Sequence, residues 1–225
     1  MKRPRLSHFV PLPKLRPFLK MPGKTLAILD VGCGSHSPSL TKHWLRTCRY
    51  YGVDRERCNN SDLDYALMDG FFGEDLETSD LSMIPDEAFD GIIMAHVIEH
   101  LGNGEEVIAR LARKLRAGGK IYLEFPSERS LTLPSGVGSL NFHDDPSHVR
   151  LYSIPVVSAA CGAAGLTVTK SGIRRDSAWI AIDLMSLPLQ LASLVRNGKL
   201  FGPLLWDLLG FASFVIATKA EHSSP

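Results

Sequence analysis

Short apolar runs alternate along this chain with segments of helical periodicity. The apolar runs predict strands at residues 26–31, 50–53, 65–68, 89–95, 120–125, 166–170 and 211–219. Helices are expected to start at Ser37-Pro38, with the serine as cap, and to span residues 103–117 and 153–164. Strands that alternate with helices predict an α/β fold, in which helices cover both faces of a doubly wound, mostly parallel sheet.

The first 23 residues are rich in proline and basic side chains, and the first acidic residue of the chain is Asp30. Prolines break every apolar run of secretory-signal length here: Pro4, Pro11, Pro13, Pro17 and Pro22. We expect residues 1–23 to be a solvated, basic, Pro-rich arm that precedes a single domain at 24–225. A basic patch that touches acidic lipid headgroups or a nucleic acid is the alternative for this arm.

An apolar insert at about residues 184–207 precedes the last predicted strand. Prolines and charged residues interrupt it, so no run reaches the roughly 20 apolar residues that a membrane-spanning helix needs. Two short amphipathic helices are expected. These helices could belong to the hydrophobic core, cover an apolar substrate as a lid, or lie in the plane of a membrane surface.

The overall composition is that of an ordinary globular protein, with 44% hydrophobic and 22% charged residues among 225. The net charge of +1 gives no general attraction to nucleic acid, so no nucleic-acid partner is expected. Four cysteines occur without a CxxC pair: Cys33, Cys48, Cys58 and Cys161. They indicate reduced thiols and a cytoplasmic protein, with a peripheral membrane contact through the insert as an option.

A glycine loop at Asp30–Gly34 follows the first predicted strand and precedes a helix. Gly32 and Gly34 allow a tight turn and close approach of a ligand to the backbone. Asp54 ends the next strand, where an acid can accept hydrogen bonds from both hydroxyls of a ribose. The dinucleotide fingerprint fails because Ser37 stands where its third glycine belongs. Asp30 would repel a pyrophosphate and attract an ammonium, so the pattern predicts a nucleoside that carries an amino acid.

At this point the chain resembles the class I S-adenosylmethionine-dependent methyltransferases over about residues 26–171, with 211–219 similar to their last strand. The resemblance rests on Asp30–Gly34, Tyr51–Asp54, Asp80–Pro85, Phe89-Asp90, Val97–Leu101 and Leu115–Gly119. It implies a Rossmann-like sheet of seven strands in the order 3-2-1-4-5-7-6, with the seventh antiparallel. It also implies that S-adenosylmethionine is the cofactor.

The resemblance further implies which residues hold the donor: Asp30, Gly32, Cys33, Gly34, Asp54, Asp80, Leu81 and His96. The loop would surround the methionine moiety, with His96 lining the same end, and Asp54 would hold the ribose. Asp80 would accept from the adenine amino group, with the Leu81 N–H near the ring. One departure is His36, which replaces the family's third glycine and either narrows the loop or points outward.

A metal site is a competing interpretation of His96-Val-Ile-Glu-His100, which matches the inverted zinc-protease pattern H-x-x-E-H. His96 and His100 would bind zinc from one helix face, with Glu99 as base, and His143 and His148 could add ligands. The segment leaves a strand and is soon followed by glycines, so a helix is not expected there. Zinc hydrolysis is therefore the less favoured alternative, and no metal is predicted in the methyltransferase site.

A polar cluster at residues 143–150 follows the fifth predicted strand and should overhang the same pocket. A similar Asp-Pro-x-His segment occurs in some methyltransferases, which favours a pocket role for His148. If the acceptor must lose a proton, His148 first and His143 second are the candidate catalytic bases, with Asp145 orienting the imidazole. A solvated loop is an equally good interpretation.

Together these patterns predict S-adenosylmethionine-dependent methyl transfer to an oxygen or nitrogen of a small-molecule or lipid-linked acceptor. A non-catalytic scaffold that binds the nucleoside is the alternative.

Overall fold

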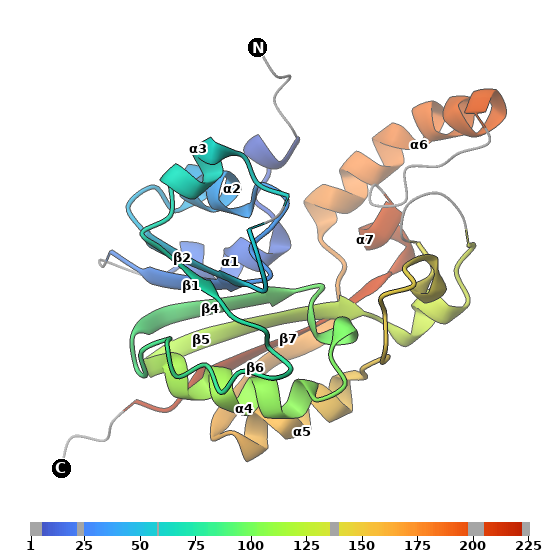
Figure 1. Cartoon of the computed structure of the whole chain (residues 1–225). Coiled ribbons are helices and arrows are strands. Elements are labelled where there is room, and N and C mark those ends of the chain that lie inside the picture. The colour runs from blue at the N-terminus through green and yellow to red at the C-terminus, as the bar shows by residue number, and fades with distance from the viewer. Residues whose placement is uncertain (1–5, 22–24, 58, 136–139, 198–204, 222–225) are drawn as a thin grey trace.

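The computed structural model describes residues 6–21, 25–57, 59–135, 140–197 and 205–221. Its centre is one sheet with the strand order β3-β2-β1-β4-β5-β7-β6 (Figure 1). The strands are β1 Ala27–Val31, β2 Arg49–Asp54, β3 Gly70–Gly73, β4 Phe89–Ala95, β5 Leu115–Pro126, β6 Leu166–Ile173 and β7 Ala212–Lys219. All neighbours pair in parallel except β7, which is antiparallel to β5 and β6. The predicted fold class and strand order are confirmed.

Helices cover both faces of this sheet, as Figure 1 shows. One face carries α1 Arg16–Leu19, α2 Ser37–Trp44 and α3 Asp62–Ala66, and the other carries α4 Gly104–Lys114 and α5 Ile154–Ala163. Two more helices, α6 Ser177–Asn197 and α7 Trp206–Leu209, lie beyond the carboxyl ends of the parallel strands. Short 3₁₀ turns complete the described chain: η1 Leu6–His8, η2 Pro13–Leu15, η3 Ile98–His100, η4 Glu128–Leu131 and η5 Phe142–Asp144.

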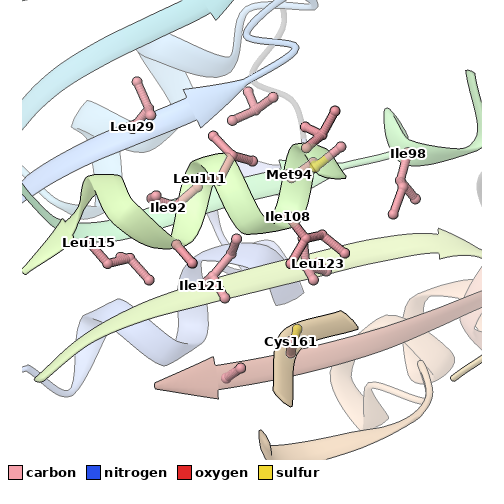
Figure 2. Close-up of a cluster of buried hydrophobic side chains, with 14 of the residues drawn as sticks. Leu29, Ile92, Met94, Ile98, Ile108, Leu111, Leu115, Ile121, Leu123 and Cys161 are labelled. Atoms are coloured by element: carbon pink, nitrogen blue, oxygen red, sulfur yellow. The ribbon is translucent and has the colours of Figure 1, made fainter. Parts of the chain in front are cut away.

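Two hydrophobic clusters hold these layers together, one on each face of the sheet. Alternation along β4 sends Ile92 and Met94 toward α4 and sends Ile93 to the opposite face. Figure 2 shows Ile108 and Leu111 of α4 over this surface. The sheet is therefore buried on both faces, which is the usual environment of parallel strands.

The N-terminal segment packs against the sheet and is not the solvated arm expected for residues 1–23. Leu15 and Phe18 are fully buried in the second cluster. Gly91 makes room for this packing, because a Cβ atom there would lie 2.5 Å from Phe18 Cε1. The Trp44 indole N–H also donates to the Ser7 carbonyl at 2.8 Å. The correction covers residues 6–21, since 1–5, 22 and 23 lie outside the described residues.

The predicted strand at 65–68 is wrong, because α3 covers the first half of that stretch and β3 starts only at Gly70. A capping box causes the difference. The Ser61 hydroxyl accepts from the Asp64 N–H, and the Asp64 carboxylate accepts from the Ser61 N–H. Two polar residues thus start a helix where apolar composition indicated a strand. The other predicted strands and helices are confirmed, with ends shifted by a few residues.

The apolar insert begins with one long helix, α6, and not with two short ones. Residues 198–204 lie outside the described residues, and α7 follows them. By length and composition α6 could cross a membrane, which by itself is weak evidence of a span. It docks through Asp183, whose buried carboxylate accepts from the Leu208 N–H at 3.1 Å. Burial raises the pKa of Asp183 to about 6, and the nearby Asp207 adds to the shift.

Three of the four cysteines are buried thiols: Cys33, Cys48 and Cys161. Burial raises the pKa of Cys48 and of Cys161 to about 11, so both stay protonated and unreactive near neutral pH. Cys58 lies outside the described residues.

Replacing Phe18 by alanine should lower the free energy of unfolding by ~3–5 kcal/mol, because a large buried side chain leaves a cavity. Urea denaturation measures the change. Leu19→Ala is the matched control, since Leu19 is the next residue but is exposed, and its effect should be within about 0.5 kcal/mol. Similar small effects for both variants would mean that the segment is solvated after all.

The raised pKa of Asp183 predicts a pH-dependent stability difference. The folded state holds this proton more tightly than the unfolded chain, so the stabilisation is complete below about pH 4 and is lost as the pH rises through 6. Asp183→Asn keeps an acceptor for the Leu208 N–H without the charge. The variant should melt a few degrees above the parent protein at pH 7.5 and should lose that advantage near pH 4. Parallel melting curves across this range would contradict the assignment.

Candidate active site

The glycine loop after β1 is held against two neighbouring strand ends. Gly32 has φ +70°, and its N–H donates to the Val53 carbonyl of β2 at 2.9 Å. A Cβ atom on Gly32 would lie 2.4 Å from Val97 Cγ2, in the segment after β4. Both the left-handed backbone and the lack of space require glycine here. Gly34 is partly buried, and its carbonyl accepts from the Ser37 N–H as α2 begins.

Asp30 points into the protein, where its carboxylate is almost fully buried. It accepts hydrogen bonds from the Tyr50 hydroxyl at 2.8 Å and from the Ser37 hydroxyl, and Lys14 Nζ lies 3.7 Å away. These partners occupy the carboxylate that the sequence analysis assigned to an ammonium. The geometry corrects that assignment, because the Asp30 carboxylate holds the glycine loop from the protein interior and does not face a ligand.

His36 and Cys33 both turn away from the loop's ligand side. His36 adopts the left-handed backbone of the glycine it replaces, with φ +63°, and its Nδ1 lies 2.6 Å from Asp64. It thus points outward and does not narrow the loop. The Cys33 side chain is buried in the hydrophobic cluster, while its carbonyl accepts from Asn60 at 2.9 Å. The Cys33 thiol therefore faces the hydrophobic cluster, and Cys33 can take part in donor binding, as predicted for this loop, only through its backbone.

A cavity of about 310 Å³ opens at the carboxyl ends of β1, β2, β3 and β4. Its lining includes Gly32, Asp54, Glu74, Asp75, Val97 and His100. The structure thus brings the glycine loop and the predicted ribose acid to one cavity, at the sheet edge where ligands of such folds bind. The volume suits a small-molecule site.

The lining of the cavity has more acidic than basic side chains. Glu56 joins Asp54, Glu74 and Asp75 at its wall, against the guanidinium of Arg55, which pairs with Asp75 at 3.5 Å. The Asp54 carboxylate accepts from the Arg55 N–H at 2.9 Å and stays partly exposed, and its partial burial raises its pKa. Such a wall favours a cationic ligand. S-Adenosylmethionine, which carries a sulfonium and an ammonium against one carboxylate, fits this charge, and its ribose diol fits Asp54.

Asp80 and Leu81 are not among the residues that line this cavity, so the structure does not bring them together with Gly32 and Asp54. Asp80 is exposed, and its carboxylate accepts from the Ser82 N–H in a turn. Leu81 is fully buried, and its N–H donates to the Ser79 hydroxyl. Asp75 lies two residues after the end of β3 and lines the cavity instead. Sequence reasoning missed Asp75 because it placed the third strand several residues too early.

His96 stands between two buried carboxylates just after β4. Its Nδ1 lies 3.1 Å from Glu99 Oε1 and its Nε2 lies 3.0 Å from Glu124 Oε1. Burial alone would lower the pKa of His96, but the hydrogen bonds to Glu124 and Glu99 raise it to about 9. The ring also packs on Trp206 of α7, with centroids 4.7 Å apart. His96 is thus a protonated link between the sheet and the insert, next to the cavity and not part of its described lining.

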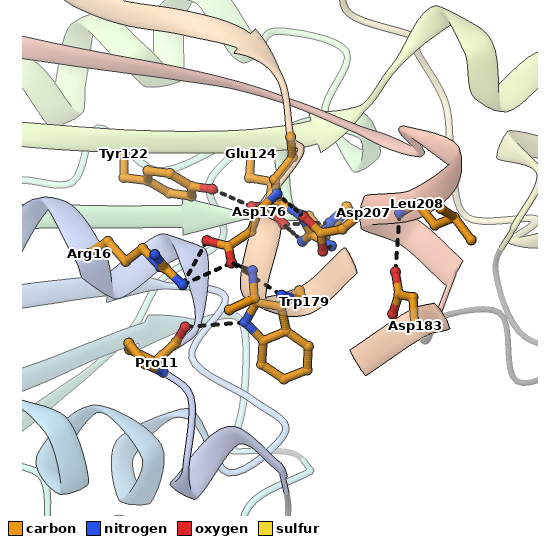
Figure 3. Close-up of polar contacts among 12 residues, drawn as sticks. Pro11, Arg16, Tyr122, Glu124, Asp176, Trp179, Asp183, Asp207 and Leu208 are labelled. Atoms are coloured by element: carbon orange, nitrogen blue, oxygen red, sulfur yellow. Dashed lines mark hydrogen bonds and ion pairs between the residues drawn. The ribbon is translucent and has the colours of Figure 1, made fainter. Parts of the chain in front are cut away.

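A buried ion network continues from Glu124, and Figure 3 shows Tyr122, Glu124 and Asp207 close together within it. Arg174 Nη1 lies 2.7 Å from Glu124 Oε1, and Arg174 also pairs with Asp207 at 2.7 Å. The Tyr122 hydroxyl donates to Glu124. The network joins β5, β6 and α7 across long stretches of sequence. No local motif contains these residues together, so sequence reasoning could not find them.

The zinc-hydrolase arrangement of His96, Glu99 and His100 is not formed. Residues 98–100 make a 3₁₀ turn and not an α-helix, and His96 is bonded to two carboxylates. The His100 Nδ1 faces the Ser147 carbonyl at 3.1 Å. The two histidines therefore do not present ligand atoms from one helix face, and this alternative is corrected.

The two candidate bases lie in the polar cluster at residues 143–150, here called the long loop, and their surroundings differ. His148 is mostly buried, and its ring packs on His100, with centroids 4.9 Å apart. The Phe142 carbonyl orients it, accepting from Nδ1 at 2.6 Å, and Asp145 binds Ser147 instead. His143 is exposed. The loop thus brings His148, through His100, to the cavity, whereas His143 is not placed there.

Comparisons with known proteins agree with this architecture. A family model described as a methyltransferase domain matches residues 6–171. Solved S-adenosylmethionine-dependent methyltransferases are similar in fold. One from Archaeoglobus fulgidus is 19% identical, with 92% of this chain and 91% of that chain covered and a TM-score of 0.58. One from Aquifex aeolicus is 15% identical, with coverages of 95% and 92% and a TM-score of 0.57. A comparison with curated protein sequences found no match.

The family match covers well over half of the chain, and the strand order, the glycine loop and the acid after β2 agree with it. The chain belongs to this methyltransferase-domain family. It is a class I methyltransferase that uses S-adenosylmethionine.

Asp54→Ala should weaken binding of S-adenosylmethionine by ~1.5–3 kcal/mol, roughly 10- to 150-fold, because hydrogen bonds to a charged group are lost. Isothermal titration calorimetry measures the affinity. Asp80→Ala is the matched control and should bind the donor like the parent protein, while Asp75→Ala should bind it more weakly. Weaker donor binding in the Asp80 variant, with unchanged binding in the Asp75 variant, would support the role that the sequence predicted for Asp80.

Proposed function

We propose that this enzyme transfers the methyl group to an oxygen or nitrogen of a lipid-linked or other small acceptor, from a position at the membrane surface. The observation that carries the proposal is the apolar outer surface of α6. Methyl transfer in general is the activity of the family, and the nature of the acceptor is the proposed part.

Helix α6 buries two of its polar side chains and exposes six of its large apolar ones. Asp183 and Gln190 are buried, with 1% and 2% of their surfaces exposed. The exposed apolar side chains are Leu184, Met185, Leu189, Leu191, Leu194 and Val195. A soluble surface helix has the opposite pattern. An apolar patch of this kind marks a contact with lipid or with another apolar partner.

The position of α6 relates this surface to the active site. Helix α6 packs on α7, and Trp206 of α7 packs on His96 beside the donor cavity. Figure 1 shows both helices beyond the carboxyl ends of the parallel strands. An acceptor held at the outer surface of α6 would therefore approach the sheet edge where the donor cavity opens.

A basic cavity of about 510 Å³ lies near the start of α6. Its lining includes Arg16, Lys20, Lys170 and Arg175. Basic side chains beside an apolar helix suit a membrane with acidic headgroups, because each cation near such a surface adds about 1 kcal/mol of attraction. This pairing supports a peripheral contact in the membrane plane.

The chemistry requires alignment, exclusion of water and, for a hydroxyl or ammonium acceptor, removal of a proton. S-Adenosylmethionine supplies, when bound, a methyl group on a positively charged sulfur that takes the electron pair of the broken bond. Gly32 and Asp54 would hold the donor at the cavity. Proton removal is assigned to the region of His148, since His143 is exposed.

The test supplies labelled S-adenosylmethionine together with vesicles made from a total lipid extract that contains acidic phospholipid. The expected result is label in an organic-extractable product and flotation of the protein with the vesicles. Replacing Leu184, Leu189 and Val195 together by serine should reduce vesicle binding by about tenfold or more, because apolar area is lost from the interface. Product formation should fall in parallel, while donor affinity stays unchanged.

Val149→Ser is the matched control, because Val149 is similarly exposed but lies on the long loop. Its vesicle binding should equal that of the parent protein. Label only in water-soluble products, with no flotation, would replace the lipid-linked acceptor by a soluble one. Donor binding without any labelled product would favour the scaffold interpretation.

A further inference from the structure

A second cluster of polar side chains borders the donor cavity. Glu99 and His100 of η3 and His148 of the long loop each place one potential ligand atom within 4.8 Å of the others. Glu99 is buried, and His148 has 7% of its side chain exposed. His100 lines the donor cavity, so the cluster lies between that cavity and the long loop.

Backbone carbonyls fix the protonation of both imidazoles. The His148 Nδ1 lies 2.6 Å from the Phe142 carbonyl, and the His100 Nδ1 lies 3.1 Å from the Ser147 carbonyl. A carbonyl oxygen only accepts, so each Nδ1 must carry the proton. Ser147 does not alter this, because its hydroxyl donates to Asp145. A neutral imidazole of this tautomer presents a lone pair on Nε2, the arrangement typical of metal-binding histidines.

One carboxylate oxygen of Glu99 lacks a partner among the described residues. Its Oε1 accepts from His96, but its buried Oε2 has no hydrogen-bond partner among the described residues. A buried carboxylate oxygen without a partner is costly. The separation of 3.9 Å between Glu99 Oε1 and His148 Nε2 is too long for a hydrogen bond. It is close to the roughly 3–4 Å between two ligands that each lie about 2.0–2.2 Å from one ion.

We propose that Glu99, His100 and His148 bind a divalent transition-metal ion of the zinc type. Two imidazoles and one carboxylate are a common donor set for such ions, and three protein ligands leave a coordination position open. Through His100 the open position borders the donor cavity, where it would take an oxygen of the acceptor. His96 is a positioning residue in this arrangement, because it holds the carboxylate of Glu99. The set differs from the H-x-x-E-H interpretation, which used His96 as a ligand and Glu99 as a base.

The role toward the acceptor rests on the proposed function, whereas metal binding does not. A bound divalent ion lowers the pKa of a coordinated hydroxyl, so the acceptor proton would pass to solvent without a histidine base. His148 would then act as a ligand and would not be the catalytic base predicted from sequence.

The experiment uses the full chain stripped with a chelator and titrated with Zn²⁺ by calorimetry, and with Co²⁺ by visible absorption. One equivalent should bind, and His148→Gln and His100→Gln should each weaken binding about 10- to 100-fold or more. His143→Gln is the matched control, because this histidine is on the same loop but exposed, and it should bind like the parent protein. Thermal melts check that every variant folds.

Binding that is absent, or that falls equally in the His143 and His148 variants, would overturn the site. The affinity of the metal-free protein for S-adenosylmethionine is measured separately, so that failure of the metal site and failure of the proposed function can be told apart. Stoichiometric metal with no methylated lipid product supports the site and contradicts the proposed acceptor. Full turnover of the chelator-treated protein supports the function and contradicts the role of the metal toward the acceptor, whereas the titrations alone decide whether the site binds metal.

Discussion

The buried carboxylate of Asp30 is the interaction on which the donor site depends. It collects hydrogen bonds from Tyr50 of β2 and Ser37 of α2, with the ammonium of Lys14 nearby. Hydrogen bonds to a charged group each contribute about 1.5–3 kcal/mol, and a buried charge stripped of them is costly. One side chain thus ties the glycine loop to the next strand, the following helix and the N-terminal segment. The loop can then keep Gly32 close to Val97 and leave Asp54 open to the cavity.

A second layer of buried charge joins this site to α7. Glu124 lies between His96 and Arg174, and Arg174 pairs with Asp207 of α7. Each charge in this series has an opposite neighbour, which makes their burial tolerable. The same series connects the insert, with its exposed apolar helix, to the end of β4. The insert and the end of β4 therefore share one series of paired buried charges.

The donor side could be predicted from sequence because its signals are local. Gly32 and Asp54 each end a short apolar run, and parallel strands bring such ends to one edge of the sheet. Asp80 does not line the donor cavity, whereas Asp75, two residues past the end of β3, does; the capping box of α3 places the third strand later than the apolar pattern predicted. The surroundings of His96 were not predictable, since its carboxylate and aromatic partners come from distant parts of the chain. The N-terminal segment is buried because Gly91 of β4 leaves room for Phe18. Composition does not reveal such a fit between distant residues.

A crystal structure of the full chain with S-adenosylhomocysteine tests the central claim most directly. The account predicts both ribose hydroxyls within hydrogen-bond distance of the carboxylate at position 54, and the amino-acid end of the ligand against the backbone at position 32. A nucleoside bound elsewhere, or one bound in this cavity while that carboxylate faces bulk solvent, would contradict it.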